Sequence, residues 1–236
     1  MGEGAMDRYN RNARLMPALI TAIPFALVLV AAGIRLSVIG ALVITPLVAM
    51  GLTHLLAQVA RDRGKQMQGS LFAEWGGTPT TVRLRHSDTV VNAVTKLRYH
   101  NKGAVLLRVA FPSESQEQAD PLDADRVYES FVDYLRDHTR DATQFPLVTE
   151  ENINFGFRRN LLGLRFIGLP LSVIATGMTF ALLFRGGTEL DQAVEWAALI
   201  VGGGFWYFWL FVCDADWVRV PADAYALRLL EASEKL

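Results

Sequence analysis

Basic and aromatic residues gather in the middle of the chain in a pattern that could bind phosphate groups. A guanidinium group donates two hydrogen bonds at once to a phosphate, and the rings of Trp75 and Tyr99 could stack on bases. The net charge of −1 gives no global basic field, so a surface facing lipid headgroups or solvent stays open as the other interpretation. The residues predicted to bind a nucleotide or oligonucleotide are Trp75, Arg83, Arg85, His86, Lys96, Arg98, Arg158 and Arg159.

Three ionisable residues within or beside long apolar blocks are candidates for a pore or gate. His54 is the only titratable residue in its apolar block, and such residues usually face a bundle interior or water. Asp214 and Asp216 follow another apolar block and could form a ring of negative charge in an oligomer. An equally good interpretation is that all three residues lie where a helix end reaches the water at the membrane surface.

The sequence contains no recognisable catalytic or metal-binding pattern. The 4 histidines lack metal-ligand spacing, and the single cysteine, Cys213, excludes an internal disulfide. Neither a phosphate-binding Walker loop nor a dinucleotide fingerprint is present. His86 and Asp88 are better explained as a surface histidine and a helix cap. We therefore expect no catalytic residue, no metal and no cofactor.

Long blocks almost free of charge predict four transmembrane helices. A helix of about 20 apolar residues crosses a hydrocarbon core of about 30 Å. The chain is too short to bury four such helices inside a soluble protein. The predicted fold is an all-α membrane protein with a mainly helical cytoplasmic domain inserted between the second and third spans. The blocks are residues 15–34, 36–60, 166–184 and 196–213.

Lysine and arginine flank the blocks on one side only, which predicts the orientation in a bacterial inner membrane. The turns between paired spans carry only Arg35 and Arg185 as basic residues. Both termini and the inserted domain should therefore be cytoplasmic. The predicted organisation is a cytoplasmic N-terminus (1–14), a first transmembrane hairpin (15–60), a cytoplasmic domain (61–160), a second hairpin (161–213) and a cytoplasmic tail (214–236).

Local patterns predict the elements of the cytoplasmic domain and tail. Alternating apolar and basic residues at 82–86 favour a short strand, and the polar stretch 113–121 indicates a loop. Helices are expected from Asp88, as N-cap, to about 109, over about 123–141, and from Pro146 into the third span. The second span should continue as a polar helix until Gly69, and Pro221 should begin an amphipathic tail helix anchored by leucines.

Two stretches resemble segments of bacterial inner-membrane proteins. They are residues 75–81 with 84–86, in which a tryptophan, two glycines and a proline precede Leu84, Arg85 and His86, and residues 151–160. The layout also resembles the membrane effectors of bacterial anti-phage defence, of the Hailong type. That resemblance implies a homo-oligomeric channel in the lipid bilayer, with a tetramer favoured. It also implies control by a single-stranded DNA oligomer or nucleotide made by a partner nucleotidyltransferase.

Two other functions remain open at this point. The first is a membrane scaffold or regulatory subunit that docks a cytoplasmic protein partner. The second is an enzyme acting on lipid headgroups, which is disfavoured because no catalytic constellation can be named.

Overall fold

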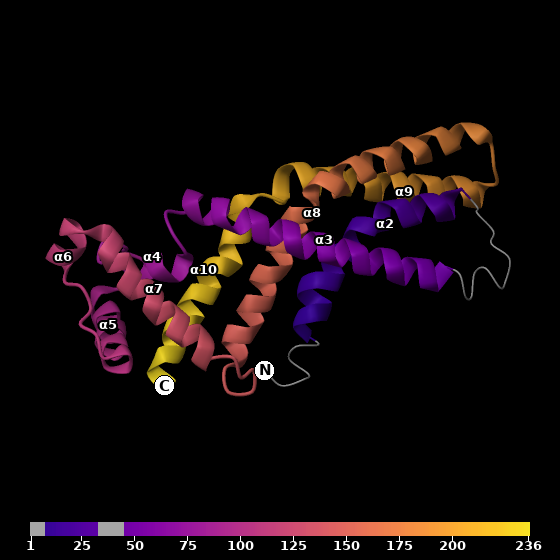
Figure 1. Cartoon of the computed structure of the whole chain (residues 1–236). Helices are drawn as coiled ribbons and strands as arrows, with labels where there is room; N and C mark the ends of the chain where they lie inside the picture. Colours follow the sequence, from indigo (N-terminus) through magenta and orange to yellow (C-terminus); the bar gives the residue numbers. More distant parts are fainter. Residues whose placement is uncertain (1–7, 33–44) are drawn as a thin grey trace. The chain divides into compact units, whose positions relative to one another are not determined.

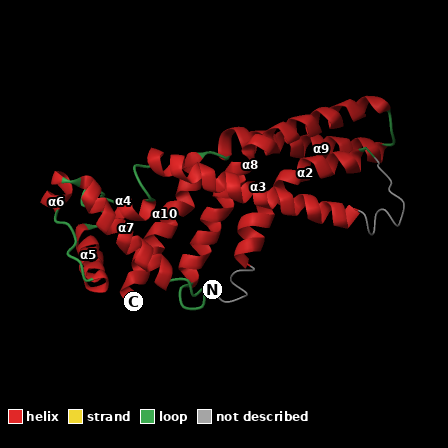
Figure 2. Cartoon of the chain, in the orientation of Figure 1, coloured by secondary structure: helices red, strands yellow, loops and turns green. Residues whose placement is uncertain are grey.

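The computed structural model describes residues 8–32 and 45–236, and every regular element in this part of the chain is helical (Figure 2). The prediction of an all-α protein is therefore confirmed for the described residues. Figure 1 carries the labels used below.

Three helical segments are long and apolar enough to cross a membrane. They are Asn10–Leu29, Pro146–Arg185 and Glu189–Val212. They correspond to the predicted first, third and fourth spans and support a membrane protein. The predicted second span, 36–60, and the turn at Arg35 lie partly or wholly outside the described residues, so the fourth crossing stays a prediction.

The chain divides into two compact units. Unit 1 comprises Met1–Arg8, Gln68–Phe155 and Arg219–Leu236, and unit 2 comprises Tyr9–Met67 and Gly156–Val218. The C-terminal segment thus belongs to the same unit as residues 68–155. Three helices have residues in both units: α3 (Thr45–Glu74), α8 (Pro146–Leu182) and α10 (Ala215–Ala232).

Unit 2 is built from long helices that approach each other at small residues. A π-helical turn, η1 (Asn10–Leu15), precedes α2 (Met16–Ala31), and α9 (Glu189–Tyr207) continues into a second π-helical turn, η4 (Phe208–Val212). Helices α8 and α9 run side by side (Figure 1), and a Cβ added at Gly202 would lie within 3.0 Å of the Thr176 hydroxyl. A helix with larger residues at such positions could not pack this closely.

Unit 1 has a core centred on α7 (Pro121–His138). One face of this helix buries Tyr128, Phe131 and Leu135, while its other face is charged. Period-3.6 patterning predicts such a helix, and its predicted position at about 123–141 is confirmed. Shorter helices complete unit 1: α4 (Pro79–Leu84), α5 (Ala93–Leu107), α6 (Glu114–Ala119) and the 3-10 turn η5 (Ser233–Lys235). A second 3-10 turn, η3 (Leu183–Arg185), follows α8 in unit 2.

Three local predictions for unit 1 are wrong. Residues 82–86 do not form a strand, because Pro79 occupies the first turn of α4 and its fixed φ favours a helix start. Asp88 is not the N-cap of α5; Asn92 caps it by accepting a hydrogen bond from the Thr95 backbone N–H at 2.9 Å. The predicted loop at 113–121 contains α6, which begins with a capping box formed by Ser113 and Gln116.

Two predicted helix ends are also wrong. Gly69 does not break α3, which ends at Glu74 before Gly76 and Gly77 take positive φ values of 80° and 142°. Helix α10 does not start at Pro221 but contains it. Proline lacks the N–H that would bond the carbonyl of Trp217, four residues earlier, and Arg158 Nη1 donates to that carbonyl at 2.8 Å instead. A side chain therefore satisfies the backbone group that the proline leaves unpaired.

The leucines of the tail contribute to the core of unit 1 rather than to a free amphipathic surface. Leu229 and Leu230 are fully buried in the same cluster as Tyr128, Phe131 and Leu135. Leu227 and Leu236 are partly buried against this cluster. The apolar positions of the tail were thus identified correctly, but their partners are helices of unit 1.

Candidate functional site

The strongest polar cluster of unit 1 is centred on Arg83. Its Nη1 donates to Asp88 Oδ2 at 2.6 Å, and its Nη2 lies 3.0 Å from Asp223 Oδ1 of α10. The Arg83 side chain is only 9% exposed, and its Nε is buried without a hydrogen-bond partner among the described residues. A buried guanidinium group between two carboxylates is strongly held, because removing either partner leaves an uncompensated charge.

Arg85 is paired as well. Its Nε and Nη2 donate to the two carboxylate oxygens of Asp125 on α7, at 2.8 and 2.7 Å. This two-pronged hydrogen bond raises the pKa of Arg85 above its ordinary value, against the opposing effect of burial. A phosphate ligand would therefore have to compete with Asp125 for this side chain.

Lys96 points inward from α5 and holds the loop between α4 and α5. Its Nζ donates to the backbone carbonyls of Arg85, at 2.6 Å, and of Asp88. Burial lowers the pKa of Lys96, and the charge of Asp88 opposes that change. The ammonium group thus links two carbonyls of this loop, in addition to the hydrogen bond that the Asp88 backbone N–H donates to the Arg85 carbonyl at 3.2 Å.

Two histidines lie beside this loop. His86 and His100 meet edge to face with ring centroids 4.9 Å apart. The Nε2–H of His100 donates to the carbonyl of Leu84 at 2.7 Å, and the Nε2 of His86 lies 3.0 Å from the carbonyl of Pro112. Burial lowers the pKa of His100, so its neutral form is favoured in the folded protein.

Residues that the sequence analysis did not single out complete the cluster. Glu117 of α6 accepts hydrogen bonds from the His86 backbone N–H at 2.9 Å and from the Tyr128 hydroxyl at 2.7 Å. Asp125 and Asp223 pair with the predicted arginines, as described above. Glu117 lies 31 residues from His86, Asp125 lies 40 residues from Arg85, and Asp223 comes from the C-terminal helix, so no local pattern could identify them.

A pocket opens over this cluster. Its volume is about 550 Å³, and polar and titratable groups line much of its wall. Ligand pockets commonly fall between about 300 and 1,000 Å³. Among the predicted ligand-binding residues, His86 and Lys96 line it; the full lining is His86, Asp88, Thr89, Val91, Asn92, Ala93, Lys96, Leu97, His100 and Glu114.

Four predicted ligand-binding residues of unit 1 lie outside the pocket lining: Arg83 and Arg85, described above, and Trp75 and Arg98. Trp75 is buried and packs on Phe72, with ring centroids 6.0 Å apart. Arg98 is exposed on α5 and pairs with Glu234 at 3.1 Å. An exposed pair of this kind contributes little to stability, so Arg98 can exchange its partner readily.

Arg158 and Arg159 belong to unit 2. The Arg158 guanidinium lies 4.8 Å from the centroid of the Trp217 ring. Arg159 is buried and donates from Nη2 to Asn160 Oδ1 at 3.2 Å. The predicted ligand-binding residues are thus divided between the two units.

The pore or gate candidates also lie in unit 2. His54 is exposed on α3, with its Nε2 3.5 Å from Gln58 Nε2. Asp214 caps α10, because its Oδ1 accepts from the Trp217 backbone N–H at 2.8 Å, and Asp216 is exposed in the first turn of that helix. Acidic residues at a helix start stabilise the helix, because their negative charge interacts favourably with the positive end of the helix dipole. Both aspartates therefore have a structural role at this end of α10.

Within residues 8–32 and 45–236, no group of three or more histidine, cysteine, aspartate or glutamate side chains could hold a metal ion. The chain matches no protein-family model, no curated protein and no solved structure. The polar cluster of unit 1 and its pocket are therefore the features from which a function has to be inferred.

Proposed function

We propose that this protein is a membrane effector: a homo-oligomeric channel, with a tetramer favoured, whose opening is controlled by a nucleotide or oligonucleotide that binds unit 1. The observation that carries the proposal is the position of Arg83. It links Asp88, in the pocket wall, to Asp223 of α10, and α10 has residues in both units.

The ligand would act through this link. A phosphate group in the pocket would pair with Lys96, which lines the pocket, and would bring negative charge beside Asp88, the partner of Arg83. A change in the Arg83–Asp88 pair alters the balance of the Arg83–Asp223 pair, and so the preferred state of α10. The ligand shifts the equilibrium only by the difference in its affinity for the two states.

The pocket volume suits one nucleotide rather than a long strand. The imidazole ring of His86 is half-buried in the pocket lining and offers an aromatic surface for a base, while His100 is buried behind it against Tyr128. If the ligand is an oligonucleotide, one of its nucleotides would occupy the pocket, and the adjacent nucleotides would lie on the surface of unit 1.

Conduction in this proposal requires several copies around an axis, because one copy supplies too few helices to enclose a pore. The proposed location is a bacterial inner membrane with both termini and unit 1 on the cytoplasmic side, where a nucleotide signal is made. The basic flanks of the apolar blocks support this orientation.

The test combines a binding assay with ion flux through liposomes, using short single-stranded DNA oligomers and nucleoside triphosphates as probes. The variant Ala93→Phe fills the pocket from the first turn of α5, and Asn101→Phe adds the same ring to an exposed position of α5 outside the pocket lining. We expect Ala93→Phe to weaken binding at least about tenfold, a loss of about 1.4 kcal/mol, and to remove the effect of the probe on flux. Asn101→Phe should behave as the unmodified protein.

These two variants are better than alanine substitutions of the arginines. Arg83→Ala would leave Asp88 and Asp223 without their partner, so lost binding could not be separated from lost folding. Equal binding by both phenylalanine variants would refute the pocket assignment. A protein that forms no axial oligomer, or whose flux no probe changes, would refute the channel.

A membrane scaffold is the second candidate, and the outer face of α5 favours it. Val94, Leu97 and Val105 are 74%, 59% and 73% exposed on one side of this helix. An exposed apolar stripe on a helix is typical of a docking surface. This function predicts that Val94→Gln with Leu97→Gln abolishes co-purification of a soluble partner, and that liposomes containing the protein conduct no ions.

A further inference from the structure

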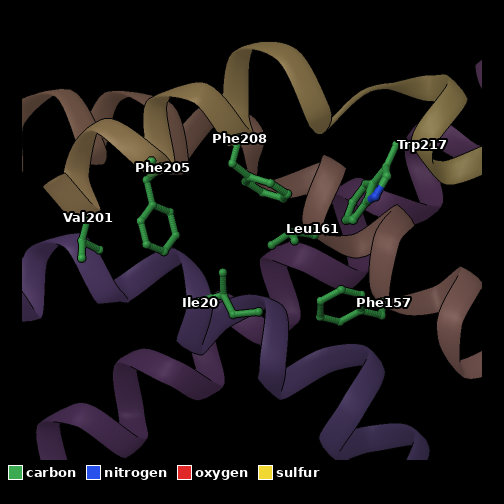
Figure 3. Close-up of a pocket in the computed structure, with 8 residues that line it drawn as sticks. Ile20, Phe157, Leu161, Val201, Phe205, Phe208 and Trp217 are labelled. Atoms are coloured by element: carbon green, nitrogen blue, oxygen red, sulfur yellow. The ribbon is translucent and has the colours of Figure 1, made fainter.

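A large cavity in unit 2 is open to the outside and has an almost entirely apolar lining. Its volume is about 440 Å³, and each of the three candidate spans contributes to its wall. Figure 3 shows side chains from α2, α8, α9, η4 and the start of α10 around one space. The lining residues are Ile20, Phe157, Leu161, Val201, Gly204, Phe205, Phe208 and Trp217.

This cavity is an apolar surface that a ligand can reach, because it is open to the outside. Protein interiors are close-packed, and even an engineered apolar cavity of about 150 Å³ takes up apolar guests such as benzene. Water gains nothing from such a lining, because it offers no hydrogen-bond partners. An apolar guest regains the dispersion contacts that an empty space would lose.

A cation lies at one wall of the cavity. The Arg158 guanidinium stacks 4.8 Å from the centroid of the Trp217 ring, and Trp217 lines the cavity. Arg158 has five N–H donors, and the carbonyl of Trp217 accepts from Nη1. The remaining donors suit the oxygens of a phosphate.

The cation and the cavity together indicate a ligand with an apolar chain and an anionic head. Asp214 and Asp216, just before Trp217, mark the place where the apolar sequence of the last span gives way to charge. We propose that the cavity binds one acyl chain of an anionic membrane phospholipid, with the phosphate of that lipid on Arg158. This inference is independent of the proposed channel function.

Two adjacent glycines of α9 provide a matched test. A Cβ added at Gly204 or at Gly203 would meet nothing within 4 Å, so both positions accept a side chain without a clash. Only Gly204 lines the cavity. Gly204→Leu therefore fills the space that the acyl chain would occupy, while Gly203→Leu makes the same chemical change outside it.

The experiment measures lipid retained by the purified full chain. Each protein is incubated in mixed micelles of mild detergent with phosphatidylglycerol or phosphatidylcholine, and native mass spectrometry counts the bound lipid. We expect Gly204→Leu to retain about tenfold less lipid, since losing the burial of two methylene groups already has an effect of that size. Gly203→Leu should retain as much lipid as the unmodified protein.

A third variant tests the head group. Arg158→Gln keeps an N–H donor for the Trp217 carbonyl but removes the charge. We expect it to lose the preference for phosphatidylglycerol over phosphatidylcholine while still binding a chain.

Equal lipid retention by Gly204→Leu and Gly203→Leu would overturn the proposal. So would a Gly204→Leu protein that keeps its lipid but no longer forms oligomers, because a second copy of the chain would then fill the cavity. Unchanged head-group preference in Arg158→Gln would overturn the phosphate contact.

Discussion

Replacing Leu229 by alanine should destabilise unit 1 strongly. The side chain is fully buried in the cluster that contains Tyr128 and Phe131 of α7. Removing a buried leucine side chain to the Cβ leaves a cavity and costs about 2–5 kcal/mol, and we take about 3 kcal/mol for this site. If the C-terminal segment instead lay on the membrane surface, the same change would not affect α7 at all.

Hydrogen exchange of the α7 amides measures this effect without requiring reversible unfolding of the spans. Exchange through opening of unit 1 becomes faster as the free energy of opening falls. A loss of about 3 kcal/mol corresponds to roughly a hundredfold faster exchange. Leu227→Ala is the matched control, because it makes the same change in the same helix at a partly buried position. A loss of about 1 kcal/mol there corresponds to about fivefold faster exchange.

The reasoning would be refuted by equal exchange rates in Leu229→Ala and Leu227→Ala. It would also be refuted if Leu229→Ala left α7 protected but weakened the binding of a tail peptide to vesicles of anionic lipid.

Two further predictions concern unit 1. Burial lowers the pKa of His100 below its ordinary value of 6.5, so the unfolded chain binds a proton that the folded chain resists. Stability should be fully present above about pH 6.5 and fall as the pH drops below it, and thermal melts should show a weaker pH dependence in His100→Gln. At Gly103, an added Cβ would lie within 3.0 Å of the Phe111 ring, so Gly103→Ala should destabilise the unit by about 1–3 kcal/mol in denaturant titrations. Gly69→Ala on α3, where a Cβ meets nothing within 4 Å, should instead stabilise the helix by about 0.5–1 kcal/mol. A Gly69→Ala protein less stable than Gly103→Ala would contradict both predictions.

The long and strongly periodic elements were predictable from the sequence. Helix α7 has one apolar and one charged face, and α8 begins at Pro146, as proline in a first helical turn indicates. The apolar blocks of three spans are visible because charge is absent from them. In these segments one local signal dominates, so single-sequence reasoning is sufficient.

The short elements and the polar cluster were not predictable. Helix α4 has only 6 residues, and its alternating pattern is compatible with a strand. The basic residues of the chain centre were recognised, but their acidic partners come from distant segments: Arg85 pairs with Asp125, and Arg83 pairs with Asp223. A single sequence shows a concentration of charge, and the fold determines how much of it is neutralised internally.

The arrangement of α5 has a consequence for how related sequences should vary. Its inward face carries Lys96, Tyr99 and His100, while its valines and Leu97 point outward. Selection for folding should therefore preserve hydrogen-bonding groups on this helix and leave its exposed apolar positions, Val94, Leu97 and Val105, free to drift toward polar residues. If homologues nevertheless keep Val94, Leu97 and Val105 apolar, something other than the stability of the single chain maintains them. The pattern of substitution along one helix would then report on a surface that is covered in the cell.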